Sequence, residues 1–134
     1  MQRVNHDVQN LSSSSKRVLV IDDEKNIRDL IDEILTEEGY EVFLARNGQD
    51  GVDLFEKYNG SFAVVILDII MPELDGKDCY YRIKEINPRV KVILTSGYSK
   101  SNVKEELIRQ GVDAYIPKPF NVDGFLETVQ KIVF

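Results

Sequence analysis

Acidic side chains follow two apolar runs of the sequence, at the point where each run ends. Asp22 and Asp23 come directly after the run at 18–21, and Asp68 comes directly after the run at 64–67. Short β-branched runs are typical of buried strands in a parallel sheet, and open α/β sheets bind ligands at the carboxyl ends of their strands. We therefore expect the three carboxylates in one crevice, where their mutual repulsion favours a bound divalent cation such as Mg²⁺.

Later predicted strands add other polar groups to the same edge. Thr95 and Ser96 follow the predicted strand at 90–94, and Lys118 stands two residues after the predicted strand at 113–116. Carboxylates, a hydroxyl, an ammonium group and a metal together suit the transfer of a phosphoryl group to a carboxylate. Asp68 is the predicted nucleophile because it ends the most apolar strand.

The remaining groups then take supporting roles. Asp23 is expected to hold Mg²⁺ directly, and Asp22 directly or through water. The backbone carbonyl of Ile70 would add an oxygen ligand. Lys118 would neutralise the transferred group as a point charge, while the Thr95 hydroxyl would hydrogen-bond a phosphoryl oxygen. Glu24 opens the following helix, where the helix dipole favours an acid, and a minor role near the metal is open to it.

Composition limits the alternatives. The chain has 134 residues, 43% hydrophobic and 30% charged, which indicates one globular domain. Its formal net charge of -6 argues against a nucleic-acid surface. No apolar run reaches the ~18 residues that a membrane span needs, so membrane insertion is not expected. The single cysteine, Cys79, allows no internal disulfide, and cytoplasm is the default compartment.

The N-terminal residues differ in character from the rest. Residues 1–15 are polar, have no period and end in four serines, which is typical of a flexible tail or of a linker from another module. His6 lies in a stretch with a faint likeness to the phosphoacceptor box of histidine kinases, but a solvated tail histidine is the favoured interpretation. Residues 16–134 form the predicted domain.

Strands and helices alternate along that domain. Helical spacing of apolar residues places helices after each predicted strand, with Gly39 and Gly111 ending two of them and Asn47 and Asn121 capping two. Five such units predict an α/β, flavodoxin-like (βα)5 doubly wound parallel sheet with strand order 2-1-3-4-5. The expected strands cover 16–21, 40–45, 62–67, 90–94 and 113–116, and a third helix is expected over 77–86.

Four short motifs in this order resemble the response-regulator receiver domains of two-component and phosphorelay signalling. Each stands at the end of a predicted strand, and the resemblance covers about 16–134. The motifs are the run from Val18 to Glu24, the run from Leu67 to Gly76 that contains Asp68, Met71-Pro72 and Asp75, Thr95-Ser96-Gly97, and Tyr115 with Lys118-Pro119-Phe120.

The resemblance implies a phosphoacceptor signalling module rather than an enzyme. Asp68 would receive its phosphoryl group from a phosphohistidine on a histidine kinase or histidine phosphotransfer protein. Thr95 and Tyr115 match the switch positions, and the face formed by the fourth helix, fifth strand and fifth helix would change and could form a homodimer. The family commonly has a cis peptide bond before the proline of Lys118-Pro119. The chain could also be the receiver segment of a hybrid histidine kinase.

Three other functions fit these residues less well. A pseudo-receiver that signals by binding alone is disfavoured because Asp23, Asp68, Thr95 and Lys118 are all present. Phosphatases of the haloacid-dehalogenase type carry a second Asp two residues after the nucleophile, where this chain has Ile70. A flavin or nucleotide binder needs a phosphate loop after the first strand, where this chain is acidic. The apolar Ile70 side chain cannot orient water, so slow autodephosphorylation is expected.

Overall fold

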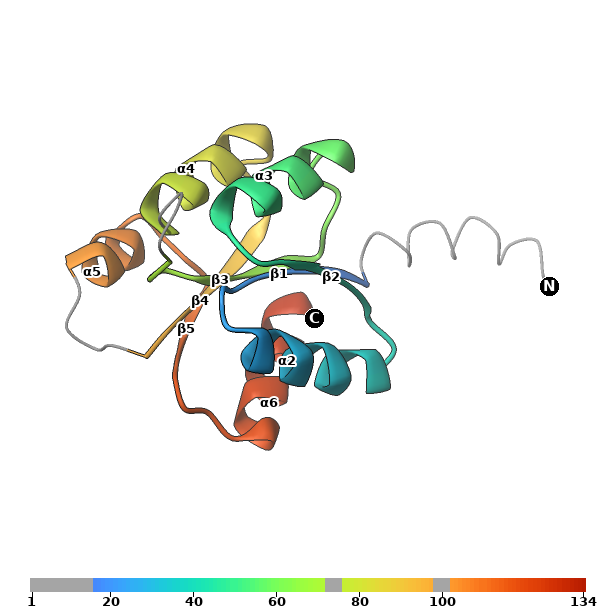
Figure 1. The fold of residues 1–134 in the computed structure, drawn as a ribbon. Coiled ribbons are helices and arrows are strands. Elements are labelled where there is room, and N and C mark those ends of the chain that lie inside the picture. Colours follow the sequence, from blue (N-terminus) through green and yellow to red (C-terminus); the bar gives the residue numbers. More distant parts are fainter. Residues whose placement is uncertain (1–15, 72–75, 98–101) are drawn as a thin grey trace, which may run out of the picture.

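The computed structural model describes residues 16–71, 76–97 and 102–134, and these form one five-stranded parallel sheet with helices on both faces (Figure 1). The strand order is β2-β1-β3-β4-β5, as the sequence predicts. The strands are β1 (Arg17–Ile21), β2 (Glu41–Ala45), β3 (Val64–Asp68), β4 (Lys91–Ser96) and β5 (Ala114–Pro117). The helices are α2 (Lys25–Glu37), α3 (Gly48–Lys57), α4 (Gly76–Ile86), α5 (Asn102–Arg109) and α6 (Val122–Val133).

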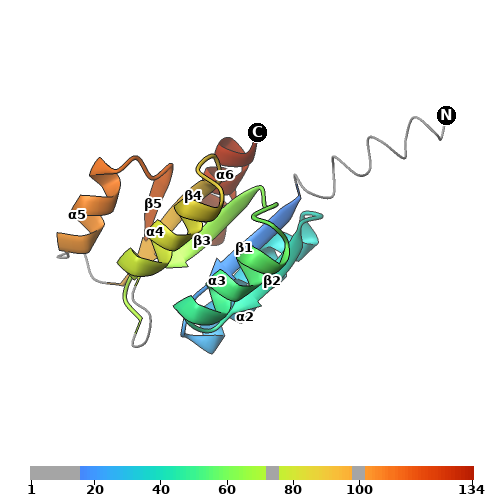
Figure 2. The same cartoon turned by 90° about the horizontal axis from the view of Figure 1, so that it is seen from above.

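The two faces of the sheet are covered by different helices. Helices α2 and α6 lie on one face, and α3, α4 and α5 lie on the other (Figures 1 and 2). Alternate residues of each central strand point to opposite faces: Val18 and Val20 pack in the core beneath α2 and α6, whereas Leu19 and Ile21 pack beneath the other helices. Burial on both faces explains why the strands are continuously apolar.

Several strand boundaries differ from the predictions by one or two residues. The third strand starts two residues later than predicted and includes Asp68, and the fourth runs on through Thr95 and Ser96. The fifth begins at Ala114 rather than at Asp113. Apolar residues in the sequence predict where these strands lie, but the ends of the strands depend on backbone pairing. Asp68 pairs in register with Thr95, so both strands extend into the polar residues that follow their apolar segments.

The predicted helix ends are present. The Asn47 side chain accepts a hydrogen bond from the backbone N–H of Asp50 at 2.8 Å, and Asn121 accepts one from Gly124 at 2.6 Å. Gly39 follows α2 with a φ of 93°, a left-handed conformation that favours glycine. Within the part of the chain that the structure describes, every helix is too short or too polar to cross a membrane.

The expectations for residues 1–15, including His6, and for Pro72 to Asp75 concern residues outside the described ranges. The division of the chain into an N-terminal tail or linker and a domain from residue 16 therefore stays a prediction.

Candidate functional site

The polar motifs converge at the carboxyl edge of the sheet. Asp68 ends the central strand β3 and pairs with Thr95 of β4, while Asp22 follows the last residue of the neighbouring strand β1. Lys118 follows β5, and its backbone N–H donates a hydrogen bond of 2.9 Å to the carbonyl of Ser96. The parallel arrangement therefore brings side chains that are almost a hundred residues apart in sequence to one edge.

Lys118 lies at the centre of this group. Its Nζ is 2.8 Å from Asp22 Oδ2, 2.8 Å from Glu24 Oε1 and 3.2 Å from Asp68 Oδ2. The contacts with Glu24 and Asp68 are hydrogen bonds, whereas the contact with Asp22 is an ion pair without hydrogen-bond alignment. The side chains of Asp22 and Asp68 are almost completely buried, so the lysine supplies the positive charge that allows two acids to lie so close together.

Backbone groups hold the other oxygen of each buried acid. Asp22 Oδ1 accepts a hydrogen bond from the N–H of Glu24 at 2.9 Å, and Asp68 Oδ1 accepts one from the N–H of Ile70 at 3.0 Å. The guanidinium of Arg28, one turn into α2, donates to the backbone carbonyl of Asp22 at 2.8 Å. These bonds fix the direction of both carboxylates and leave one oxygen of each facing Lys118.

A small open pocket gives access to the acids. It has a volume of about 200 Å³ and is lined by Asp23, Glu24, Asp68, Ile70, Gly97 and Lys118. Asp22 does not line this pocket, and Asp23 lies at it with its side chain exposed. The Asp68 carboxylate is thus largely buried and still lines the open pocket.

The donor set fits a divalent cation. Carboxylate oxygens of Asp22, Glu24 and Asp68 all lie within 4.8 Å of one another, and hard oxygen ligands are those that Mg²⁺ prefers. The cluster is consistent with a Mg²⁺ site. Asp22 and Asp68 belong both to this cluster and to the predicted set of metal ligands. Glu24 joins the cluster, although the sequence suggested only a minor role; its position two residues after Asp22 was the available signal. The predicted ligands Asp23 and Ile70 line the same pocket.

Burial and charge alter the titration of this group. Burial raises the pKa of the Asp68 carboxyl to about 6, and the neighbouring Asp22 carboxylate acts in the same direction, while the Ile70 N–H and Lys118 oppose both. Burial alone would lower the pKa of the Lys118 ammonium, but its close contacts with the carboxylates of Asp22, Glu24 and Asp68 outweigh burial and raise it. Lys118 therefore stays charged at neutral pH, while the Asp68 carboxyl titrates at about pH 6, just below neutral pH.

We predict that Mg²⁺ binding weakens as the pH falls through 6. The folded protein takes up a proton on Asp68 at about pH 6, and a metal ligand must be deprotonated. Affinity should be about tenfold lower at pH 5 than at pH 7. Without metal, a fall in pH should have the opposite effect and stabilise the fold. The folded state binds the Asp68 proton more tightly than the unfolded state does, so the free energy of unfolding should rise as the pH falls from 7 towards 4.

Calorimetric titration with Mg²⁺ measures the first effect, and urea unfolding in EDTA measures the second. Asp68→Asn is the control, because the variant lacks the titrating group. A pH dependence that persists unchanged in Asp68→Asn would contradict the assignment to this carboxyl.

Two predicted switch residues have unused polar atoms. The hydroxyl groups of Thr95 and Tyr115 are both buried, and neither has a hydrogen-bond partner in the described part of the molecule. The Tyr115 ring lies 4.4 Å from the ammonium of Lys104 in α5, which is a cation–π distance. Thr95 pairs in register with Asp68, so these two buried residues lie side by side on neighbouring strands.

The comparisons with known proteins agree with this geometry. A family model described as the response regulator receiver domain matches residues 18–130. The chain belongs to this family. A receiver domain typically acts as a phosphoacceptor rather than as a true enzyme. The prediction of a receiver domain from the four motifs is therefore confirmed. The acidic pocket of Asp22, Glu24 and Asp68 is also one that this family leads us to expect.

Individual relatives cover nearly the same length. The chain is 31% identical over 117 residues to sporulation initiation phosphotransferase F of Bacillus subtilis, covering 87% of this chain and 93% of that protein. The structure of a CheY-like receiver domain from Methanospirillum hungatei superimposes with a TM-score of 0.82 at 32% identity, covering 88% and 93% of the two chains. The CheY-like (βα)5 fold is thus confirmed.

A third solved structure similar to this chain comes from a complex that contains Mg²⁺ and BeF3. A chain from the CheX–CheY–BeF3–Mg²⁺ complex of Borrelia burgdorferi superimposes with a TM-score of 0.81 at 27% identity, covering 88% of this receiver domain and 89% of that chain. The Lys118–Pro119 bond, for which the resemblance implied the cis form, is cis.

Proposed function

We propose that this receiver domain accepts a phosphoryl group on Asp68, in a Mg²⁺-dependent transfer from a phosphohistidine of a histidine kinase or histidine phosphotransfer protein. The observation that carries the proposal is the position of Asp68: it is buried at the end of the central strand, yet it lines an open pocket and contacts the Lys118 ammonium. A carboxylate held in this way is a nucleophile with its charge compensation already in place.

In the proposed reaction, an oxygen of Asp68 attacks the phosphorus atom and forms the P–O bond of an acyl phosphate. The P–N bond of the phosphohistidine breaks, and the imidazole nitrogen keeps the electron pair. The carboxylates of Asp22, Glu24 and Asp68, with Asp23 and the Ile70 carbonyl at the same pocket, are the groups that would hold Mg²⁺. The metal would offset the charge of the phosphoryl oxygens.

The chain's own residues then respond to the new group. Lys118 exchanges its contact with the Asp68 carboxylate for a phosphoryl oxygen, and the Thr95 hydroxyl gains the acceptor that it now lacks. Each contact exists only in the phosphorylated state, so each shifts the conformational equilibrium by its own free energy. Tyr115 lies on β5, the strand that pairs with the Thr95 strand β4. We propose that it relays the change to the face formed by α5, β5 and α6.

Mass spectrometry tests the proposal directly. The intact protein is incubated with acetyl phosphate, and separately with a phosphorylated histidine phosphotransfer protein, in Mg²⁺ or in EDTA. We expect the gain of one phosphoryl group in Mg²⁺ and none in EDTA or in Asp68→Asn. The control is Asp53→Asn, which changes an exposed carboxylate of α3 and should leave the gain intact.

No gain from either donor would overturn the proposal and favour a domain that signals by binding alone. A gain that survives in Asp68→Asn would place the acceptor elsewhere. The lifetime of the acyl phosphate, measured in the same experiment, tests the slow autodephosphorylation expected from the exposed and apolar Ile70 side chain.

Thr95→Val is expected to separate stability from switching. The Thr95 hydroxyl is buried and has no hydrogen-bond partner among the residues that the structure describes, so its removal should leave the free energy of unfolding unchanged or raise it by up to about 1 kcal/mol. The variant should still be phosphorylated but should lose most of the spectral change at β5 that phosphorylation causes. Urea unfolding and NMR spectra measure the two effects. Thr95→Ser keeps the hydroxyl and should restore switching; a failure to do so would contradict the role of that group.

We propose that the domain carries out no catalysis on a released substrate and that it works in the cytoplasm. Dimerisation through the face of α5, β5 and α6 stays a prediction, which the oligomeric state of the phosphorylated protein would test.

A further inference from the structure

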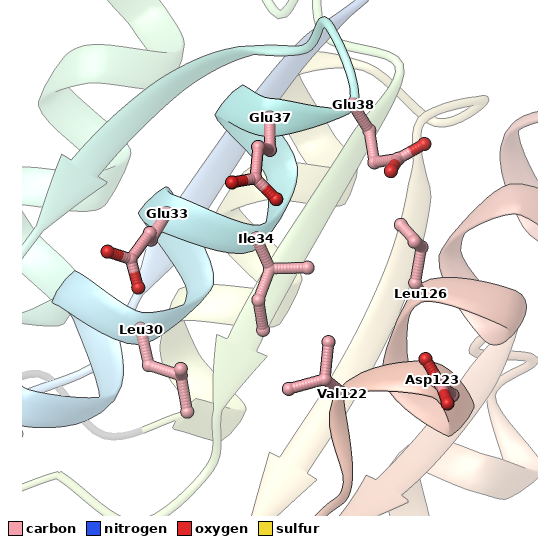
Figure 3. Close-up of a pocket in the computed structure, with 8 residues that line it drawn as sticks. All are labelled: Leu30, Glu33, Ile34, Glu37, Glu38, Val122, Asp123 and Leu126. Atoms are coloured by element: carbon pink, nitrogen blue, oxygen red, sulfur yellow. The ribbon is translucent and has the colours of Figure 1, made fainter.

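A groove runs between α2 and α6, on the flank of the domain and away from the Asp68 pocket. Figure 3 shows its eight lining residues, and its volume is about 350 Å³. Apolar side chains form the floor from both helices. The lining residues are Leu30, Glu33, Ile34, Glu37 and Glu38 of the α2 segment, and Val122, Asp123 and Leu126 of α6.

The floor is apolar but incompletely covered. Ile34 is buried against the core, whereas Leu30 and Leu126 are only partly buried and Val122 is 45% exposed. Two neighbouring helices with apolar side chains between them offer the kind of groove into which a third helix can pack. The apolar area already exposed here would be removed from water by such a partner.

Every charged residue that lines the groove is acidic. Glu33, Glu37 and Glu38 come from the α2 segment and Asp123 from α6, and no lysine, arginine or histidine is among the lining residues. Figure 3 shows these carboxylates around the apolar side chains. Glu33 and Glu37 are four residues apart on one helix, a spacing at which like charges repel. A partner with positive charges would relieve this repulsion.

The charge pattern of α2 is also unlike that of the other described helices. Helices α3, α4, α5 and α6 each have an acid in the first turn and a basic residue in the last turn, which complements the helix dipole. Helix α2 has neither, and its carboxyl end instead carries Glu37 and is followed by Glu38. This arrangement is unfavourable for the isolated domain, and a cation supplied from outside would offset it.

We propose that this groove binds a basic amphipathic helix of a partner protein, with its apolar side chains on the floor and its lysines and arginines beside the acids. A symmetric dimer through this groove is disfavoured, because it would bring the same acids against one another, and the net charge of -6 opposes association of two copies in general. Nucleic acids and anionic lipid surfaces are repelled for the same reason. The interaction does not rest on phosphorylation of Asp68.

The test uses a designed probe and the full chain. The probe is a synthetic peptide of about 18 residues, long enough to form helix, with leucines at i, i+3, i+4 and i+7 and lysine or arginine beside them. A matched peptide carries glutamate at the basic positions. NMR titration of the isotope-labelled protein at low salt should show shifts confined to α2 and α6, with the acidic peptide at least about tenfold weaker.

Variants separate the groove from general charge. Glu37→Lys should weaken the basic peptide about tenfold or more and should not lower the melting temperature, because it replaces a repulsive pair with Glu33 by an attractive one at the same four-residue spacing. Glu56→Lys, an exposed site on α3, is its matched control. Val122→Ser should also weaken binding, whereas Ile108→Ser on α5 should not; both native side chains are 45% exposed. Asp68→Asn should bind as the wild type does.

Three results would each overturn the proposal: no binding of the basic peptide at millimolar concentration, equal binding of the basic and acidic peptides, or shifts centred outside α2 and α6. Loss of binding in Asp68→Asn would instead tie the contact to the phosphorylation site and overturn its independence from that site. Because the peptide titration needs no phosphoryl donor, its failure is distinct from failure of the proposed phosphoacceptor function.

Discussion

Lys118→Met is expected to lower the free energy of unfolding by about 3–5 kcal/mol at pH 7 in EDTA, the range found when one partner of a buried ion pair is removed. The reason is the position of Lys118 between Asp22 and Asp68, whose side chains are 2% and 4% exposed. Without the ammonium group these two carboxylates lie close together with no compensating charge. The methionine keeps most of the packing of the lysine stem, so the loss reports the charge.

Mg²⁺ should restore much of this loss, because a cation bound only to the folded state stabilises it in proportion to its affinity and concentration. Lowering the pH to 5 should also reduce the loss, because Asp68 then takes up a proton. Urea unfolding in EDTA and in Mg²⁺ measures both effects.

The matched control for this variant is Lys25→Met. Lys25 pairs with Asp29 at 2.7 Å, but both side chains are more than half exposed, so its removal should cost less than about 1 kcal/mol. Equal losses in the two variants, or a loss in Lys118→Met that Mg²⁺ leaves unchanged, would contradict the account of Lys118 as the cation that holds the acidic cluster together when metal is removed.

Gly76→Ala is expected to lower the free energy of unfolding by about 2 kcal/mol, as overpacking a tight site does. Gly76 begins α4, and a Cβ there would overlap the backbone of Ile69, the residue after Asp68. Alanine normally gains about 1 kcal/mol over glycine inside a helix, but here the obstacle is main chain and cannot rotate away. Relief of the overlap has to move the segment that carries Asp68.

The same variant should therefore accept phosphoryl groups more slowly from acetyl phosphate, since the Asp68 carboxylate and the Ile70 carbonyl would be displaced. Urea unfolding and the mass-spectrometric time course measure the two effects. Gly97→Ala is the control for stability, because its Cβ would meet no atom within 4 Å, and its unfolding free energy should change by no more than about 0.5 kcal/mol. An equal change in both variants would show that the Ile69 contact is unimportant.

The Asp68 pocket and the α2–α6 groove are connected through one helix. Helix α2 begins beside Glu24, which contacts Lys118, and it carries Arg28, which donates to the Asp22 carbonyl, before its outer turns form one wall of the groove. A partner seated in the groove would therefore contact an element that also orients the acidic cluster. Phosphorylation rates measured with and without the basic peptide would show whether the two sites are coupled.

Much of the fold followed from local sequence patterns. The apolar runs predicted five strands and their order, because strands buried on both faces of a parallel sheet must be apolar throughout, and right-handed crossovers leave few topologies. Asn47, Asn121 and Gly39 marked helix ends because caps are local chemistry. Asp68 was identified as the central acid for a related reason: it follows the most apolar run, which has to be the middle strand.

Tertiary structure decided what local patterns do not contain. The sequence could not tell which neighbours of Asp22 turn inward: Asp23 remains exposed at the pocket, whereas Glu24 reaches Lys118, a residue 94 positions away. That outcome depends on how the chain leaves β1 and enters α2. The unpartnered Thr95 hydroxyl and the groove between α2 and α6 are likewise properties of packing. Composition and periodicity determine which elements form and in what order, but the direction of each side chain depends on contacts between elements distant in sequence.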